Sequence, residues 1–316
     1  MQKIILYYTF TPIADPAAVR LWQRSVCDAL GLKGRIIISS HGINGTLGGD
    51  EAALKRYVRQ TWEFAAFKDI DFKWSEGTGQ DFPKLVVRVR DEIVTFGVAD
   101  AIKVDEHGIV GGGKHLSPQQ VHELVDERGD DVIFFDGRNA YEAAVGHFKN
   151  AIVPDVDRTR DFAIELADPK YDAIRDKPIV TYCTGGIRCE VLSLMMKKNG
   201  FSNVYQIEGG IVKYGEAYKD GGLWEGSLYV FDDRMGLKFS ESAKDIATCV
   251  HCGQTTSNYE NCEIESCNAL KIMCDGCVDS GIRWCVEHVP SSFTPARRKT
   301  LNKANSNRAG NGNNCK

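Results

Sequence analysis

The 316-residue sequence lacks any long apolar run and any strong excess of one charge. No stretch approaches the ~18 apolar residues that a membrane-spanning helix needs, and the first residues lack the charged, apolar and small-residue regions of a secretion signal. We therefore expect a cytoplasmic protein with no membrane partner. The net charge of −4 provides no overall attraction to nucleic acid, so any RNA binding must come from local patches.

Fingerprints of common redox cofactors are also absent. The sequence contains no glycine-rich flavin or nicotinamide motif and no two-histidine-one-carboxylate pattern for iron. The chain is too long for one typical domain, and its patterns divide into three segments and a tail. Nothing in the sequence indicates an oligomeric state.

Residues 1–95 are expected to form a small domain that binds RNA or another ligand. The order of the predicted elements, βαββαβ, is typical of a ferredoxin-like (acylphosphatase-like) domain with an extra strand. This fold by itself does not set a function. The elements are a strand at 3–10, a helix from Pro16 to Gly31, a strand at 35–40, a glycine-punctuated hairpin at 42–47 that leads to a third strand, a helix from Asp50, and strands at 71–74 and 85–89.

A second domain is expected at residues 117–224, after a linker at 96–116 that carries three glycines at 111–113. It begins with a helix capping box at Ser117–Gln120, and a continuously apolar strand follows at 132–135. Helix and strand patterns then alternate, which predicts a parallel-sheet α/β domain. The active site of such a sheet lies beyond the carboxyl ends of its strands.

One loop of this domain carries the predicted chemistry. The apolar strand at 180–182 ends at Cys183, where loop amides, the N-terminus of the next helix and Arg188 converge on the thiol. Together they are expected to lower the cysteine pKa from ~8.5 into the range of ~3.5–7.5. We predict that Cys183 is the nucleophile and Arg188 its cationic partner. The loop between them consists of Thr184, Gly185, Gly186 and Ile187.

The alternative interpretation of Cys183 is a small buried hydrophobe, but such a residue needs neither the glycines nor the arginine. The second thiol, Cys189, falls in the first turn of the helix. We expect it to pack there, the alternative being that it resolves a bond formed at Cys183.

The pattern around this loop resembles that of rhodanese domains. The matching features are Asp136-Gly-Arg138, Glu142, Gly146-His147 and the glycine pair at 209–210, and Cys183 occupies the position that carries a persulfide in those proteins. Asp136 and Arg138 are expected to form a structural ion pair, and His147 to be a structural hydrogen-bonding residue. Four residues separate Cys183 from Arg188, which is the smaller loop associated with sulfur rather than the Cys-x5-Arg loop of related phosphatases.

Three longer strings make the chain similar to the tRNA uridine hydroxylase (TrhO) family, from residue 1 to about residue 240. They are Cys-Thr-Gly-Gly-Ile-Arg-Cys-Glu at 183–190, Gly-Ile-Asn-Gly-Thr at 42–46 and Gln-Ile-Glu-Gly-Gly-Ile at 206–211. The resemblance implies an enzyme that uses O2 to form 5-hydroxyuridine at the wobble position of the tRNA anticodon. The residues alone indicate only an activated thiol.

Two hypotheses describe what Cys183 does in such a reaction: its thiolate attacks C6 of the uracil, or a persulfide on Cys183 is the reactive form. A rhodanese-type sulfurtransferase that relays persulfide sulfur to an acceptor is the alternative function. A non-enzymatic RNA-binding scaffold is the third.

Seven of the eleven cysteines crowd into the segment 225–290. In a chain expected to be cytoplasmic, thiolates at this spacing favour zinc over disulfides. Four pairs supply eight ligands for two structural Zn2+ ions. We predict that the first and third pairs bind one ion and the second and fourth the other, with sequential pairing as the alternative. The pairs are Cys249 and Cys252, Cys262 and Cys267, Cys274 and Cys277, and Cys285 and His288.

The tail at 291–316 is basic and contains no acidic residue. Its composition predicts disorder, and Arg297, Arg298 and Lys299 are expected to contact RNA phosphates; a solvated tail without a partner is the alternative. Lys84, Arg88 and Arg90 are expected to extend this basic surface, because residues two apart on a strand share a face.

Overall fold

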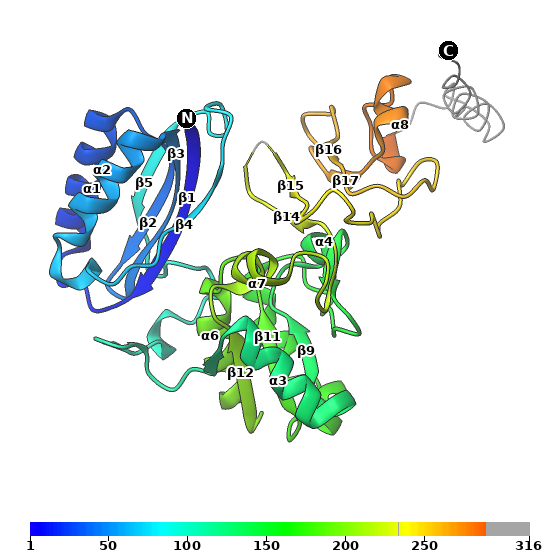
Figure 1. Cartoon of the computed structure of the whole chain (residues 1–316), viewed down its shortest axis with the longest axis horizontal. Helices are drawn as coiled ribbons and strands as arrows, with labels where there is room; N and C mark the ends of the chain where they lie inside the picture. Colours follow the sequence, from blue (N-terminus) through cyan, green and yellow to red (C-terminus); the bar gives the residue numbers. More distant parts are fainter. Residues whose placement is uncertain (233, 289–316) are drawn as a thin grey trace, which may run out of the picture. The chain divides into compact units, whose positions relative to one another are not determined.

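The structure is a computed structural model that describes residues 1–232 and 234–288 (Figure 1). The predictions for Arg297, Arg298, Lys299 and the rest of the tail lie outside the described residues. The chain divides into two compact units, residues 1–243 and the residues from 244 onward. Within the described part, no helix combines the length and the apolar character that a membrane crossing requires.

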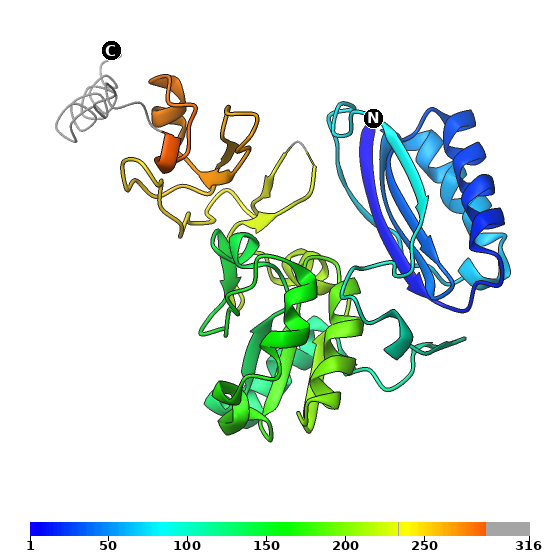
Figure 2. The ribbon, with the colours of Figure 1, turned by 180° about the vertical axis from the view of Figure 1, so that it is seen from behind.

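The first domain of the larger unit is the predicted acylphosphatase-like fold. Its sheet has the strand order β4-β1-β3-β2-β5, and β5 is the extra strand, parallel to β2 at one edge. Helices α1 and α2 cover one face of the sheet (Figure 1, and from behind in Figure 2). The elements are β1 (Gln2–Phe10), α1 (Pro16–Leu30), β2 (Lys33–Ser39), β3 (Gly42–Asp50), α2 (Glu51–Trp62), η1 (Ala65–Phe67), β4 (Lys73–Glu76) and β5 (Leu85–Val89).

Alternation along the strands decides what each face of this sheet does. In β1, Ile5 and Tyr7 are fully buried in the core beneath the helices. Leu6 and Tyr8 point to the opposite face, which no helix of this domain covers. One sequence prediction here was wrong: residues 42–47 belong to β3 itself, and the hairpin turn lies at residues 40–41, because β2 and β3 already pair at Ser39 and Gly42.

The second domain has the predicted parallel sheet, with the strand order β8-β12-β11-β9. Strand β11 is buried along its whole length because helices pack on both of its faces: Ile179 contributes to the core that contains α6, and Val180 to the core that contains α3 and α7. The elements are β8 (Lys114–Leu116), α3 (Pro118–Arg128), η3 (Gly129–Asp131), β9 (Ile133–Asp136), α4 (Ala140–Ala143), β10 (Gly146–Phe148), η4 (Thr159–Asp161), α5 (Phe162–Glu165), η5 (Pro169–Ile174), β11 (Pro178–Tyr182), α6 (Ile187–Lys198), β12 (Asn203–Ile207) and α7 (Gly210–Tyr218).

The segment expected as a linker is more ordered than its composition indicates. It contains η2 (Ala99–Ala101), β6 (Val104–Asp105) and β7 (Gly108–Ile109), and Phe96 and Ile102 are buried in the core that contains α6. Its last three residues form β8, which pairs with β12. Residues 114–116 therefore belong to the sheet of the second domain. The side-chain pattern of the sequence did not reveal this short strand, because strands pair through backbone groups.

The segment expected at 225–290 is divided by the contacts of the structure, since its first part packs with the larger unit. Strand β13 (Trp224–Gly226) pairs with β10, and β14 (Leu228–Tyr229) pairs with β15 (Gly236–Leu237), all inside the larger unit. From residue 244 onward, the described elements are β16 (Tyr259–Asn261), β17 (Leu270–Ile272), α8 (Asp275–Asp279) and η6 (Val286–His288). The core of this unit is very small and consists of Met273 and Ile282 packed among cysteines.

Candidate active site

Cys183 lies where the sequence predicts it, directly after β11 and before α6. Gly186 at the N-cap of α6 has the left-handed φ of 100°, and its N–H donates to the Cys183 Sγ over 3.2 Å. The first turn of α7 holds the loop from behind: the N–H of Ile211 donates to the Cys183 carbonyl over 2.9 Å, and that of Val212 to the Thr184 carbonyl over 3.0 Å. The thiol therefore sits in a backbone cradle.

The electrostatics of this cradle favour the thiolate. Burial raises the pKa of Cys183, but a hydrogen bond from Cys189, the charge of Arg188 and backbone N–H groups of the first helical turn lower it, to about 6. Burial and the neighbouring Cys183 raise the pKa of Cys189 well above its ordinary value. Cys189 is fully buried, as expected for a packing residue, but it also donates a hydrogen bond to Cys183.

Arg188 is held by a partner that sequence reasoning missed. Its guanidinium forms a bidentate ion pair with Glu142, with Nη1–Oε1 and Nη2–Oε2 distances of 2.5 and 2.7 Å, and Glu142 is fully buried. Nη2 also donates to the Thr184 hydroxyl over 3.3 Å. The Glu142 pair thus fixes Arg188 beside the loop. Glu142 was visible in the sequence only as part of the rhodanese pattern.

The expected ion pair between Asp136 and Arg138 is confirmed. Both side chains are fully buried, and the Nη2–Oδ2 distance is 2.6 Å. Arg138 also donates to the carbonyls of Glu142 and Gly146, so it braces the backbone behind the site. His147 lies at the edge of this group, with Nδ1 at 3.1 Å from the Phe148 carbonyl oxygen.

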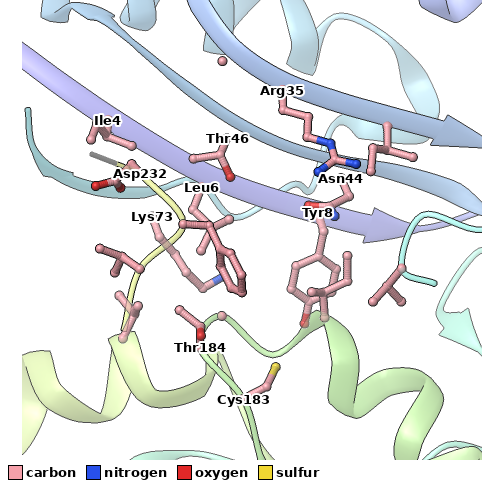
Figure 3. A pocket seen from close by; sticks show the side chains of 18 of the residues that line it. Ile4, Leu6, Tyr8, Arg35, Asn44, Thr46, Lys73, Cys183, Thr184 and Asp232 are labelled. Carbon is pink, nitrogen blue, oxygen red and sulfur yellow. The ribbon is translucent and has the colours of Figure 1, made fainter. Parts of the chain in front are cut away.

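A cavity of about 580 Å³ lies over the loop. One wall contains Cys183 and Thr184, and the other is the helix-free face of the N-terminal sheet (Figure 3). The two walls approach closely, because a Cβ on Gly185 would lie 2.7 Å from the Leu6 side chain and one on Gly186 would lie 2.7 Å from the Tyr8 hydroxyl. The paired glycines of the loop are thus the residues that let the N-terminal domain cover it.

Tyr8 is a further site residue that sequence reasoning missed. Its hydroxyl donates to Glu190 Oε1 over 3.1 Å, although the two residues lie 182 positions apart. The same carboxylate bonds His115 Nε2 at 2.8 Å and Gln206 Nε2 at 3.1 Å. Burial, Glu190 and Cys183 raise the pKa of Tyr8 well above its ordinary value, so Tyr8 stays protonated beside the thiol. The hydrogen bond to Glu190, opposed by burial, raises the pKa of His115.

The three basic residues predicted on and beside β5 divide into two groups. Lys84 lines the cavity, whereas Arg88 and Arg90 are exposed and do not line it. Arg35 on the neighbouring strand β2 was not predicted, but it lines the cavity and is exposed. Lys73 also lines the cavity, and its Nζ lies 5.3 Å from the centroid of the Tyr8 ring. The cavity thus has cationic side chains along its sheet wall.

The eight predicted metal ligands form two clusters, in each of which the ligand atoms lie within 4.8 Å of one another. The grouping is the predicted one, with the first and third pairs together and the second and fourth together, and sequential pairing is wrong. No disulfide joins the cysteines of residues 1–232 and 234–288. His251 belongs to neither cluster, and its Nε2 lies 2.9 Å from the Trp284 carbonyl oxygen. The clusters are Cys249, Cys252, Cys274 and Cys277, and Cys262, Cys267, Cys285 and His288.

Each cluster can hold a metal ion, and its donor set fits zinc. Three or four soft sulfur donors with at most one imidazole are the ligands that tetrahedral structural zinc prefers. All four positions of each cluster are protein side chains, so no position remains for a water or a substrate.

Known proteins resemble the chain over all three segments. Residues 2–93 match the family model described as UPF0176 acylphosphatase like domain, residues 117–217 the rhodanese-like domain, and residues 225–288 the rhodanase C-terminal model. A tRNA uridine(34) hydroxylase of Corynebacterium urealyticum is 60% identical over 276 residues, which are 87% of this chain and 93% of that protein. One of Arthrobacter sp. (strain FB24) is 59% identical over 283 residues, 89% of this chain and 95% of that protein.

Proposed function

Because the chain belongs to the tRNA uridine(34) hydroxylase family, we propose that it hydroxylates uridine 34 of tRNA, the wobble position, to 5-hydroxyuridine with O2 as co-substrate. The observation that carries this proposal is a thiol of lowered pKa that faces a cavity of about 580 Å³. That volume lies in the range of ~300–1,000 Å³ typical of small-molecule sites and accommodates a nucleobase taken out of its stack. A tRNA substrate also supports the expected cytoplasmic location.

The role that the geometry supports for Cys183 is nucleophilic addition to the base. With a pKa of about 6, the sulfur is mostly thiolate at neutral pH. Attack on C6 of the uracil forms an S–C6 bond, and the electron pair of the C5–C6 double bond moves toward O4. C5 thereby becomes electron-rich and takes up one oxygen atom of O2, while the other oxygen atom leaves as water with two protons and two electrons from an external two-electron reductant. Loss of the C5 proton then expels the Cys183 thiolate from C6 and restores the C5–C6 double bond. Arg188 acts on this step by stabilising the thiolate, and a persulfide on Cys183 is the competing reactive form.

The test is replacement of Cys183 by serine. Nucleoside mass spectrometry of tRNA, from cells in which the variant is the only copy, is expected to show loss of 5-hydroxyuridine by at least ~100-fold, because a neutral hydroxyl is a much weaker nucleophile than a thiolate. Cys27→Ala is the control, since Cys27 lies on the buried face of α1, in the core between the helices and the sheet, and does not line the cavity. Intact hydroxylation in the Cys183→Ser strain would contradict both the thiolate and the persulfide version of the mechanism.

A persulfide sulfurtransferase is the second candidate, favoured by the rhodanese-like match over 117–217 and by the short loop between Cys183 and Arg188. The same tRNA digest separates the two candidates. Unchanged 5-hydroxyuridine together with altered thiolated nucleosides in the Cys183→Ser strain favours sulfur transfer.

We also propose that the two clusters bind structural Zn2+, which would organise a unit whose own apolar core is very small. For the tRNA backbone, we propose contacts from Lys84, Arg88 and Arg90, joined by Arg35. If one of these residues contacts a phosphate, its replacement is expected to reduce the salt dependence of tRNA binding.

A further inference from the structure

The Gly-Ile-Asn-Gly-Thr string at 42–46 has no part in the reaction described above, although it contributes to the family resemblance. In the structure it is part of β3, and its two polar side chains, Asn44 and Thr46, line the cavity over Cys183. This string therefore supplies part of the wall that a substrate base would meet.

Asn44 lies directly opposite Tyr8 in the antiparallel pairing of β1 and β3. Opposed residues on one face have Cβ atoms about 4.5–5.5 Å apart, so the Asn44 amide and the Tyr8 side chain are neighbours. Figure 3 shows both on the sheet wall of the cavity, with Tyr8 reaching toward the loop that carries Cys183. Asn44 thus belongs to the wall that faces the thiol.

A hydrogen bond fixes the orientation of the Asn44 amide. Its Nδ2 donates to the carbonyl of Ile93 over 3.0 Å. Ile93 is itself held, because it is 1% exposed and because the neighbouring Glu92 carboxylate accepts the N–H groups of Phe96 and Gly97 over 2.7 and 2.9 Å. Among the described residues, no side chain or backbone group bonds Oδ1 or the second N–H of Asn44. The amide therefore presents one acceptor and one donor in a fixed order.

Uracil and cytosine differ in the order of these groups. Uracil offers N3–H as a donor beside O4 as an acceptor, whereas cytosine offers N3 as an acceptor beside a donating N4 amino group. A freely rotating carboxamide pairs with either base, since its two ends exchange. An amide whose nitrogen is bonded to Ile93 cannot exchange its ends without breaking that bond.

We propose that Asn44 reads the imide edge of the target base and selects uridine over cytidine. Its Oδ1 accepts N3–H, and its second Nδ2–H donates to O4. N3 lies opposite C6 in the ring, so a base with C6 near Cys183 directs N3 toward the sheet wall. This inference rests on the proposed function, because it takes a tRNA uridine as the substrate.

The test measures binding of the full chain to anticodon stem–loop RNAs that differ only in U34 or C34. One bidentate pair provides roughly 5- to 150-fold discrimination, which is the expected preference of the wild type for U34. Asn44→Ala is expected to bring the U34-to-C34 affinity ratio to about one. Asn44→Asp is also expected to bring it to about one, because both carboxylate oxygens are acceptors: with either base one oxygen accepts an N–H group and the other is repelled by O4 of uracil or N3 of cytosine. Thr46→Ala, on the same face, is expected to keep the ratio whatever its effect on affinity.

A wild type that binds both RNAs equally, or an Asn44→Ala variant that keeps the wild-type ratio, overturns the inference. Asn44→Asp is nearly isosteric and keeps the test decisive if the alanine variant does not fold. Binding is measured without turnover, so the two proposals fail separately. If the chain prefers U34 through Asn44 but forms no 5-hydroxyuridine, only the proposed reaction is wrong. If hydroxylation depends on Cys183 but Asn44→Ala leaves the U34-to-C34 ratio unaltered, only this inference is wrong.

Discussion

The molecule uses cysteine in two opposite ways. In the unit from residue 244 onward, seven cysteines and one histidine form two closed clusters, in which each ligand is useful only with its three partners. At the end of β11, a single cysteine acts alone, and its character comes from groups of other kinds: backbone N–H groups, a second thiol and a paired arginine. The clusters are thus built from similar residues at regular spacing along the chain. The activation of Cys183 instead depends on different kinds of groups that the fold brings together.

The largest expected effect tests the cluster side of this comparison. Cys274→Ser removes one ligand, and zinc content measured by elemental mass spectrometry is expected to fall from two ions per chain to one. Because a structural zinc contributes an apparent ~10–16 kcal/mol, limited proteolysis is expected to cut the unit from residue 244 onward.

The chain offers a matched control for this experiment. His251 lies between Cys249 and Cys252 in sequence but in neither cluster. His251→Ala is therefore expected to keep two zinc ions, and a loss of one ion in this variant would contradict the assignment of ligands.

The second effect concerns the partner that holds Arg188. Glu142→Gln keeps the size of the side chain but leaves a buried arginine without its counter-charge, which costs about 3–5 kcal/mol of folding free energy. Urea unfolding measures this loss. Glu208→Gln, which breaks a half-exposed pair with Lys213, is the control and is expected to change stability by less than about 1 kcal/mol. Equal stability of the two variants would show that the Arg188 pair is not buried in solution.

The third effect is the pH dependence of the Cys183 thiol. Because only the thiolate reacts, the rate of alkylation by iodoacetamide is expected to rise tenfold per pH unit below about 6 and to level off above it. Burial raises the pKa of Cys27 to about 12, so Cys27 is expected to stay unmodified in the folded chain. A Cys183 rate that still rises between pH 7 and pH 9 would contradict the lowered pKa.

The same shift affects stability. The pKa of Cys183 in the folded chain lies below its ordinary value of ~8.5, so the thiolate stabilises the folded state fully above that ordinary value. This contribution declines as the pH falls toward about 6 and is absent below that.

The smallest effect is that of Tyr8→Phe. The variant loses one hydrogen bond to Glu190, whose carboxylate keeps His115 and Gln206, so thermal unfolding is expected to reveal a loss of about 0.5–1.5 kcal/mol. Tyr7→Phe is the companion variant, because Tyr7 points to the opposite face of the same strand and its hydroxyl bonds Tyr57. Only Tyr8→Phe is expected to change the alkylation rate of Cys183, and an equal rate in both variants would remove Tyr8 from the site.

Local patterns in the sequence were enough for a large part of this protein. Both domain folds, the place of Cys183 between a strand and a helix, and the grouping of the eight candidate ligands into two clusters were predicted correctly. Each of these depends on short-range order: the period of a strand or helix, the residues that follow a strand, or the spacing of ligand pairs. The Asp136–Arg138 pair was expected from the rhodanese resemblance and is confirmed.

The sequence by itself therefore determined a thiol at the end of a strand, beside an arginine, and two clusters that could hold metal ions, because spacing along the chain encodes both. Only the tertiary structure decided what faces the thiol. Glu142 reaches Arg188 from another loop, and Tyr8 and Asn44 reach the cavity from another domain, because strand pairing and the close approach of β1 to Gly185 and Gly186 bring them there. Such contacts join residues as many as 182 positions apart and leave no periodic trace in the sequence.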